Sequence, residues 1–358
     1  MADFFEIDFL DVETKSSGDA ICLRYEISGQ VYIHVVDGGY LSTGTKLVDH
    51  IREHYNSPSY IDNVVSTHND GDHARGLATV LENFSIGALW MLRPWIYAPE
   101  LLSRFSRYTN ANNLASALRE AYPNLAALED IAIRKRIPIY DPFQGAEIGA
   151  FRVMAPTRAR YLELIVTSDK TPNEAVGRSL EEAIISVFQK AASVVNLIRA
   201  AWGAEAFPAD DTSNENEMSV VQYARLCGEG VLLTADTGRD GLQEVIDYAP
   251  YIGLSLPGID RFQVPHHGGR HNVTSELLNA IVGPPLQSPP AQTHFRAYIS
   301  SAADDDDHPR KVVVRAMIHR GASVVTTEGK SIQAHKNAPA RNGWSAVAPV
   351  AYPDDYET

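Results

Sequence analysis

The chain has 358 residues, of which 44% are hydrophobic and 21% charged, so its composition is that of an ordinary globular protein with ample material for a core. Its formal net charge of −14 argues against a broad positive surface that would bind nucleic acid regardless of sequence, although it allows a local basic patch. No apolar stretch is long enough to cross a bilayer, and the start MADFFEIDFL lacks the features of a secretory signal. We therefore expect a soluble, cytoplasmic protein with no membrane partner.

Short apolar runs rich in β-branched residues predict strands along most of the chain. In chain order these runs are FEIDFL (5–10), AICLRYE (20–26), VYIHVV (31–36), IDNVVST (61–67), GALWML (87–92), FRVMAP (151–156), MSVVQYARL (218–226), GVLLTAD (230–236), RFQVPHH (261–267), RAYISSA (296–302) and ASVVTT (322–327). Helical patterns follow several of them, over residues 42–55, 76–84 and 241–249. This order predicts a mixed α/β protein with two groups of strands.

The domain organisation that we expect is a single domain over residues 1–335, with helical insertions around 97–130 and 172–203. In the first insertion, short helices are broken by YTNANN and by Pro123. Residues 336–358 are rich in alanine, proline and polar residues, which predicts a C-terminal arm or tail.

The second insertion contains the strongest helical pattern of the chain. Ser179 and Glu182 form a capping box, and apolar residues then recur at helical spacing as far as Ile198. The resulting apolar stripe, over 180–202, predicts core packing, a homodimer contact or a docking surface for a partner protein. A membrane-surface role is disfavoured, because the opposite face is not rich in lysine or arginine.

One short loop gathers four side chains that can bind metal ions. The stretch STHNDGDHARGL follows a predicted strand and contains His68, Asp70, Asp72 and His73. An Asp-Gly-Asp stretch can also be a simple turn. Carboxylates crowded so closely repel one another and shift each other's pKa values, however, and a bound cation removes that penalty. We therefore favour a metal site.

Further acidic and imidazole side chains fall at the ends of other predicted strands. They are Asp37, Asp236, His266, His267 and His308. Strand ends in layered α/β folds converge on one edge, where polar groups surround a ligand without being buried unpaired. For Asp37 the alternative is a turn former before two glycines, and for His308 it is a solvated histidine after a run of aspartates.

These residues carry a resemblance to a known family. The order Asp-Gly-Gly, His-x-Asp-x-Asp-His, LLTAD and VPHHGG resembles the metallo-β-lactamase fold and, within it, the hydrolase domain of the competence protein ComEC. FLDVETKSSGDAI, NEMSVVQYARLCGEGVLLTADTG, YISSAADDDDHP and VVTTEGKSI are similar to further motifs of that branch, so the match runs from Phe5 to Ile332 apart from the insertions. The resemblance implies a four-layer αββα sandwich with a dinuclear metal site at one edge.

The resemblance also implies a division of the ligands between two ions. One ion would take His68, Asp70 and His266, while its neighbour would take Asp72, His73 and His308. Asp236 would bridge the two. His267 would reach the substrate or donate a proton, although two adjacent imidazoles in one loop cannot be told apart by spacing.

The remaining roles concern catalysis and metal identity. Besides His267, we expect Asp72 and Asp37 to act in catalysis, with Asp37 and Asp19 orienting the histidine ligands through hydrogen bonds. Asp70 stands where many relatives have histidine, and VMAPTRA supplies no histidine where many relatives have one. Oxygen in place of nitrogen makes the site harder, so Mn²⁺ or Zn²⁺ is expected for the two divalent ions.

Two divalent ions side by side predict hydrolysis, because they activate water and neutralise a leaving oxygen. Phosphodiesters fit best, and the resemblance implies a nuclease. Nearby cations support an anionic substrate, namely Arg75, Arg270, Arg310 and Lys311, together with His271. The alternatives are a hydrolase of small phosphoesters or cyclic nucleotides, with a pocket roofed by 97–130, and a metal-bearing interaction module whose substrate a partner chooses.

Overall fold

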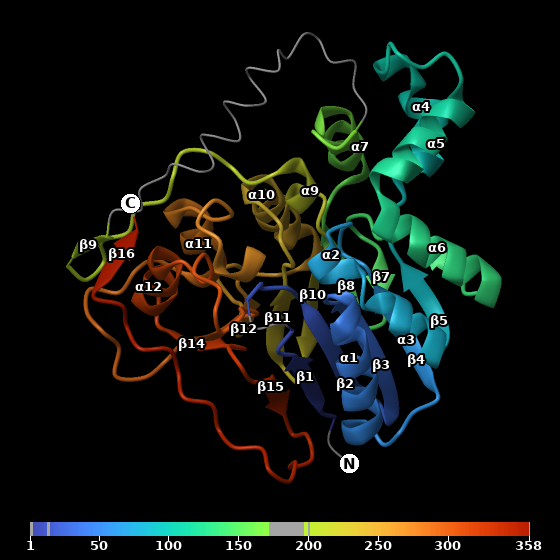
Figure 1. The fold of residues 1–358 in the computed structure, drawn as a ribbon. Helices are drawn as coiled ribbons and strands as arrows, with labels where there is room; N and C mark the ends of the chain where they lie inside the picture. The colour runs from blue at the N-terminus through green and yellow to red at the C-terminus, as the bar shows by residue number, and fades with distance from the viewer. Residues whose placement is uncertain (1–2, 13–14, 172–196, 200, 358) are drawn as a thin grey trace.

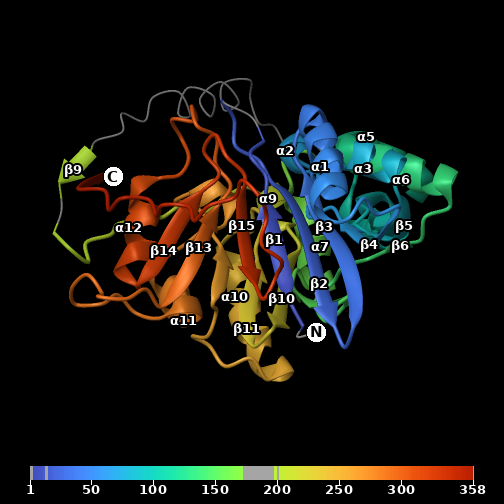
Figure 2. The same cartoon turned by 90° about the horizontal axis from the view of Figure 1, so that it is seen from below.

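Two seven-stranded sheets packed face to face form the centre of the molecule (Figures 1 and 2). The computed structural model describes residues 3–12, 15–171, 197–199 and 201–357. Between the sheets, the rings of Phe9 and Tyr298 stack with their centroids 5.0 Å apart. Helices cover the outer face of each sheet, so the predicted four-layer αββα sandwich is confirmed.

The first sheet has the strand order β15-β1-β2-β3-β4-β5-β6. Its strands are β1 (Phe5–Phe9), β2 (Ala20–Ile27), β3 (Gln30–Gly38), β4 (Tyr60–Val65), β5 (Ser85–Trp90), β6 (Ile139–Tyr140) and β15 (Ile332–Lys336). The strands from β15 to β3 run antiparallel, whereas those from β3 to β6 run parallel.

The second sheet repeats this plan in the order β14-β13-β12-β11-β10-β8-β7. Its strands are β7 (Glu147–Ile148), β8 (Phe151–Ala155), β10 (Val221–Leu226), β11 (Glu229–Leu233), β12 (Arg261–Gln263), β13 (Phe295–Ile299) and β14 (Ala322–Thr326). The strands from β11 to β14 are parallel. Because parallel strands end at a common edge, each sheet brings several carboxyl-terminal strand ends together, and the loops beyond them carry the predicted site residues.

Helices form the two outer layers, and further short helices lie in residues 97–130 and in other connections. On the first sheet lie α1 (Leu41–His54), α3 (Leu77–Asn83) and α6 (Pro123–Lys135), while α10 (Arg239–Tyr248), α11 (Ser275–Val282) and α12 (Lys311–His319) cover the second (Figure 1). The remaining helices are α2 (Gly71–Ala74), α4 (Ala98–Leu101), α5 (Ala111–Ala121), α7 (Arg158–Thr167), α9 (Asn214–Glu217) and the 3₁₀ turns η1 (Pro94–Tyr97), η2 (Leu102–Arg104), η3 (Ala249–Ile252) and η4 (His266–Gly268). Residues 97–130, where we predict a helical insertion, contain α4, η2, α5 and the start of α6, which begins at Pro123.

The strongest helical prediction falls mainly outside the described residues, since it covers 180–202. At its end the prediction is wrong, because Leu197–Arg199 form a strand, β9, that pairs antiparallel with β16 (Asp355–Glu357). Pairing with a partner strand distant in sequence overrides a local helical pattern. Among the described residues, no helix combines the length and apolar character that crossing a membrane requires.

The C-terminal segment after β15 packs along the body of the protein. The guanidinium of Arg341 donates to Asp8 at 2.8 and 2.9 Å and to Glu6 at 2.8 Å, and both acceptors are buried. Further on, the Val350 N–H donates to the carbonyl of Val324 in β14 at 2.8 Å. A buried carboxylate is stable only when it is paired, so these contacts fix the start of the segment.

A second buried polar group has no such partner. His34 of β3 is fully buried with its ring 5.2 Å from that of Phe151, and neither ring nitrogen has a hydrogen-bond partner among the described residues. Burial lowers the pKa of His34 to about 3.

The fold should therefore lose stability in mild acid. In the unfolded chain His34 takes up a proton below its ordinary pKa of about 6.5, whereas in the folded chain it stays neutral down to about pH 3. The contribution of His34 to the free energy of unfolding is therefore complete above pH 6.5 and declines as the pH falls towards 3. Between pH 7 and pH 5, His34 should lower the free energy of unfolding of the wild type by about 2 kcal/mol. The His34→Leu variant should lack this decrease, which urea denaturation at the two pH values measures. An unchanged pH dependence in this variant would contradict the assignment.

Candidate metal centre

The loop that contains His68 and His73 is held in place by close backbone contacts. After β4 the chain turns through residues 66–70 into the single turn of α2, and His73 lies fully buried in that turn. A Cβ added to Gly76 would lie 1.9 Å from the carbonyl oxygen of Gly38. Glycine at Gly76 thus lets the end of β3 approach this loop, which brings Asp37 against His73.

The N-terminal loop approaches the same turn from another side. The Asp19 N–H donates to the Asp72 carbonyl oxygen at 3.1 Å, and a Cβ added to Gly18 would lie 2.6 Å from that oxygen. The absence of a side chain at Gly18 therefore allows Asp19 and Asp72 to reach the same centre.

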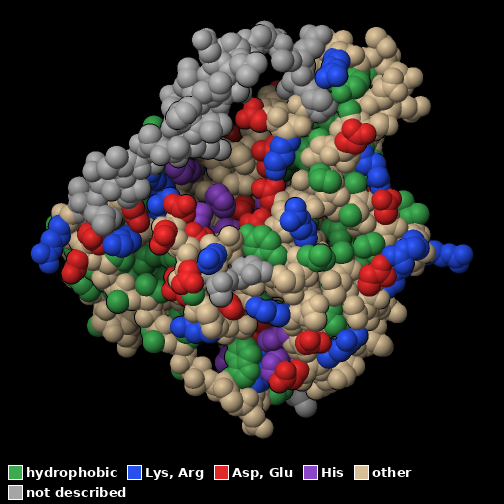
Figure 3. All heavy atoms as spheres, viewed as in Figure 1, with side chains coloured by type: hydrophobic (Ala, Val, Ile, Leu, Met, Phe, Trp, Pro, Cys, Tyr) green, Lys and Arg blue, Asp and Glu red, His purple; other side chains and the backbone are tan. Residues whose placement is uncertain are grey.

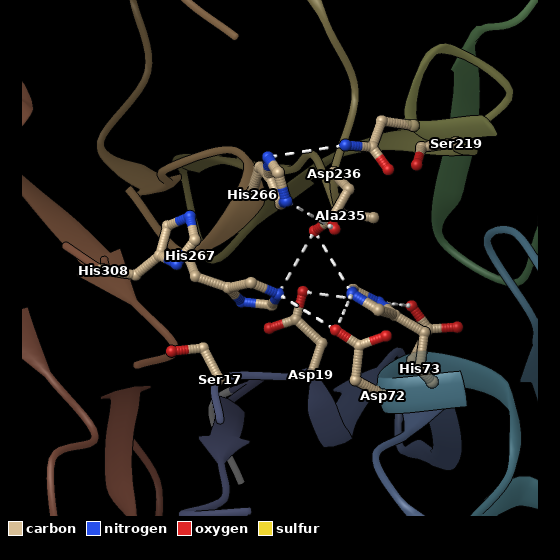
Figure 4. A network of polar contacts seen from close by, with 12 residues as sticks. Ser17, Asp19, Asp72, His73, Ser219, Ala235, Asp236, His266, His267 and His308 are labelled. Carbon is tan, nitrogen blue, oxygen red and sulfur yellow. Dashed lines mark hydrogen bonds and ion pairs between the residues drawn. The ribbon is translucent and has the colours of Figure 1, made fainter. Parts of the chain in front are cut away.

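The imidazoles of four histidines converge on the carboxylate of Asp236, and Figure 4 labels three of them, His73, His266 and His267. Its Oδ1 lies 3.2 Å from Nε2 of His73 and 3.7 Å from Nε2 of His267. Its Oδ2 lies 3.8 Å from Nε2 of His68 and 3.7 Å from Nε2 of His266. The two oxygens of Asp236 thus face two different pairs of ring nitrogens.

In three of these imidazoles the other ring nitrogen is held by a neighbouring polar group, whereas Nδ1 of His267 has no hydrogen-bond partner among the described residues. His73 Nδ1 donates to Asp37 at 2.9 Å, and His266 Nδ1 donates to the side-chain oxygen of Asn272 at 3.0 Å. His68 Nδ1 lies 3.0 Å from the Thr67 hydroxyl and 3.3 Å from that of Ser219. A partner on Nδ1 fixes the orientation of the ring and leaves Nε2 to bind a metal ion.

Several of the atoms that face one another are buried and unsatisfied. No described residue gives a hydrogen bond to Nε2 of His68, His73 or His267, or to Oδ1 of Asp19 or Asp236. One ligand atom from each of Asp19, His73, Asp236 and His267 lies within 4.8 Å of the other three. Each buried unsatisfied group costs about 1–3 kcal/mol. A divalent cation among them would satisfy these atoms, so the residues fit a metal site.

The charges of the cluster support the same conclusion. Burial raises the pKa of Asp236, but His73, His267 and His266 outweigh burial and hold the pKa well below its ordinary value. Burial lowers the pKa of His267, but Asp236 and Asp72 outweigh it and raise the pKa to about 9. Buried carboxylates thus demand positive charge, from protons or from a metal ion, and metal binding must compete with protonation of the histidines.

Two predicted ligands lie at the margin of this cluster. Asp70 forms a 2.6 Å ion pair with Lys170, and the Asp70 side chain is partly exposed. The ring of His308 lies 5.2 Å from that of His266 and 5.9 Å from that of His267, measured between centroids. Burial, reinforced by His267 and His266, lowers the pKa of His308 to about 4, so its ring is neutral at pH 7. Their assignment as ligands stays a prediction.

The structure also places residues whose roles the sequence did not suggest. Asp19, expected only to orient a ligand, belongs to the group of four ligand atoms. Asn272 fixes His266 and donates to the carbonyl oxygens of Asp236 and Thr237. The hydroxyl of Ser219 lies near His68, and the sequence does offer a signal for this role, because Ser219 lies in the NEMSVV motif. For Asn272 the local sequence offers none, since nothing distinguishes it from an ordinary loop residue.

The surface around the cluster carries both signs of charge. Figure 3 shows histidine side chains gathered in a hollow of this face, with acidic and basic side chains around them. Arg270 follows His267 by three residues and has no ion-pair partner among the residues that the structure describes, whereas Arg310 pairs with Asp307 at 2.5 Å. An unpaired guanidinium close in sequence to the cluster is available to an anion.

A narrow apolar pocket lies beside His68. Leu92, Tyr122, Leu125, Tyr161 and Met218 line it together with residues 66–69 and Glu215. It has about 10 Å³ of room for the centre of a water molecule, which accommodates about one water. Tyr122 and Leu125 come from residues 97–130, so this segment contributes to the wall next to the candidate metal centre.

Comparisons with known proteins give weak matches. No family model and no curated protein sequence matches the chain. Among solved structures, CmlA, a diiron β-hydroxylase from Streptomyces venezuelae, is matched over 93% of this chain in a variant structure, with 12% identity and a TM-score of 0.41. This chain spans about half of that protein, 54%.

Two further solved structures match a smaller share of the chain. A hydrolase named AbOPH in the β-lactamase superfamily is matched over 72% of this chain and 89% of its own length, with 11% identity and a TM-score of 0.34. A candidate metallo-β-lactamase from Thermotoga maritima is matched over 70% of this chain and 92% of its own length, with 12% identity and a TM-score of 0.29. Likenesses this weak carry no conclusion about function, and none of the three proteins is described as ComEC-like.

The hydrogen bond from His73 to Asp37 gives a direct test of the site. Replacing Asp37→Asn removes the charge that orients the ring, so affinity for Mn²⁺ or Zn²⁺ should fall about 10- to 100-fold. Isothermal titration calorimetry on the ion-free protein measures this change. Asp49→Asn, at an exposed position of α1, is the matched control and should bind as the wild type does. Equal affinity in both variants would show that Asp37 does not support a metal ligand.

Proposed function

We propose that the protein is a metal-dependent hydrolase of phosphodiesters that acts on nucleic acid. The observation that carries the proposal is the convergence of four imidazole Nε2 atoms on the two oxygens of Asp236, with buried ligand atoms left unsatisfied. This donor set of nitrogen and carboxylate oxygen suits Zn²⁺ or Mn²⁺.

The geometry supports two ion positions, one on each side of Asp236. His68 and His266 would bind the ion on the Oδ2 side of Asp236. His73, His267 and Asp72 would bind the ion on the Oδ1 side, with Asp19 beside them. In this proposal His267 is a metal ligand, whereas we expected it to reach the substrate or donate a proton. The change is supported by its grouping with Asp19, His73 and Asp236. Two divalent ions would supply a water of lowered pKa and positive charge opposite an anionic leaving oxygen.

The chain's own residues have three further tasks in this proposal. Asp37, Ser219 and Asn272 hold the imidazoles in orientation. Arg270, which has no ion-pair partner among the described residues, would pair with a phosphate oxygen, which supports an anionic substrate. His308, with a neutral ring at the partly exposed side of the cluster, would complete the second ion's ligands as the sequence suggests.

Replacing the shared carboxylate tests the proposal. Asp236→Asn should lower the nicking of supercoiled plasmid by at least about 10³-fold, because both ion positions lose their common ligand. Elemental analysis of the same protein should show fewer than two ions per chain, whereas Asp49→Asn should keep both the metal and the activity.

The possible results separate the candidate functions. Full activity in Asp236→Asn would contradict the proposal. Two bound ions without plasmid nicking and without turnover of bis-p-nitrophenyl phosphate would favour a metal-bearing interaction module instead.

A second candidate function is hydrolysis of a small phosphoester or cyclic nucleotide. The wall that Tyr122 and Leu125 form beside His68 favours it; the pocket itself accommodates about one water, so a small substrate would lie against this wall at the metal centre and not inside the pocket. Enlarging this wall with Leu125→Phe should then lower turnover of small phosphoesters at least about 10-fold and leave plasmid nicking unchanged. Steady-state assays on both substrates measure this, and parallel losses would argue against the second candidate.

A further inference from the structure

The C-terminal strand β16 contacts the first turn of α12, the helix that begins three residues after His308. Glu357 accepts hydrogen bonds from the backbone N–H groups of Lys311, at 3.0 Å, and Val312, at 3.2 Å. The first N–H groups of a helix have no partner inside the helix, and a carboxylate there also interacts favourably with the helix dipole. Glu357 is 7% exposed, so water competes little for these hydrogen bonds.

Other residues of the same segment hold α12 along its length. The fully buried Arg315 donates to the carbonyl of Pro353 at 2.6 Å, and its guanidinium lies over the rings of Tyr352 and Tyr356 at 4.6 and 5.2 Å. Lys311 forms an ion pair with Asp355 at 2.8 Å. Residues 352–357, which we call the C-terminal clamp, therefore fix the position and the first turn of the helix.

The start of α12 is in turn connected to the candidate metal centre. The N–H of Arg310 donates at 3.1 Å to the carbonyl of Gly268, the residue after His267. A Cβ added to Gly268 would lie 2.7 Å from Pro309, so the two loops pack tightly. On the other side of His308, Asp305 accepts from the His308 N–H at 3.2 Å and from the Ser17 hydroxyl at 2.6 Å. The position of His308 thus depends on Asp305 before it and on α12 after it.

We propose that the C-terminal clamp positions His308, with Glu357 as the positioning residue that acts through the first turn of α12. The inference rests on the proposed function, because it takes His308 as a ligand in the metal centre. Glu357 touches neither substrate nor ligand atoms, and its effect passes through the backbone of residues 308–312.

Titration of the ion-free protein with Co²⁺, followed by visible absorption, tests the inference on the full chain. The wild type should take up two ions. Glu357→Ala and His308→Ala should both keep one ion and bind the other at least about 10-fold more weakly. Asp354→Ala is the matched control and should titrate as the wild type does, because the Asp354 side chain is 78% exposed and pairs with Arg199 and not with α12. Two tightly bound ions in either Glu357→Ala or His308→Ala would overturn the inference.

Hydrogen exchange of the ion-free protein gives a readout that does not depend on the metal. Glu357→Ala should raise exchange at the amides of His308 and 310–312 and also at 266–269, whereas Asp354→Ala should raise neither. Faster exchange confined to Lys311 and Val312 would overturn the inference, because the loop with His308 would then hold without the clamp. If the wild type binds no Co²⁺, or Asp236→Asn binds two ions, the proposed function fails while this exchange result still shows whether the clamp holds the loop.

Discussion

The structure depends on one electrostatic constraint, the accumulation of buried carboxylates around the edge where both sheets end. Asp19, Asp37 and Asp236 lie at most 2% exposed within reach of one another's imidazole partners. Such groups are stable only with compensating positive charge and with ligands or hydrogen bonds for every oxygen. The fold provides imidazoles on all sides, which leaves a set of donors suited to divalent cations.

The scaffold meets this constraint with parallel strands and close backbone packing. The strands β3 and β4 of one sheet and β11 and β12 of the other end at the same edge, so loops distant in sequence meet there. Glycines at Gly18 and Gly76 let those loops approach more closely than any side chain would allow. The outer helices and the C-terminal clamp then fix the loops from behind, as the contacts of Glu357 with α12 illustrate.

The sequence was informative where structure is local. Runs such as VYIHVV and GVLLTAD predicted strands because alternation and β-branching are properties of short segments, and the polar residues at their ends predicted the edge of the site. It failed for β6 and β7, whose two residues carry no periodicity, for β9 and β16, which exist through pairing with each other, and for β15, which pairs with β1.

Local sequence pattern also failed to predict the roles of some residues within the site. Asp305 looks like one of a solvated run of aspartates, yet it binds Ser17 from the other end of the chain. Asp19 and Asp70 were judged by their place in motifs, whereas the fold puts Asp19 among the ligand atoms and pairs Asp70 with Lys170. Contacts between residues so distant in sequence are set by tertiary packing, which local spacing does not encode.

The most direct measurement is the anomalous scattering of crystals grown with Mn²⁺. If Asp236 bridges a metal pair, two anomalous peaks will flank its carboxylate, one beside His73 and His267 and the other beside His68 and His266. A map without a peak at Asp236, or with ions bound elsewhere on the protein, would contradict the account.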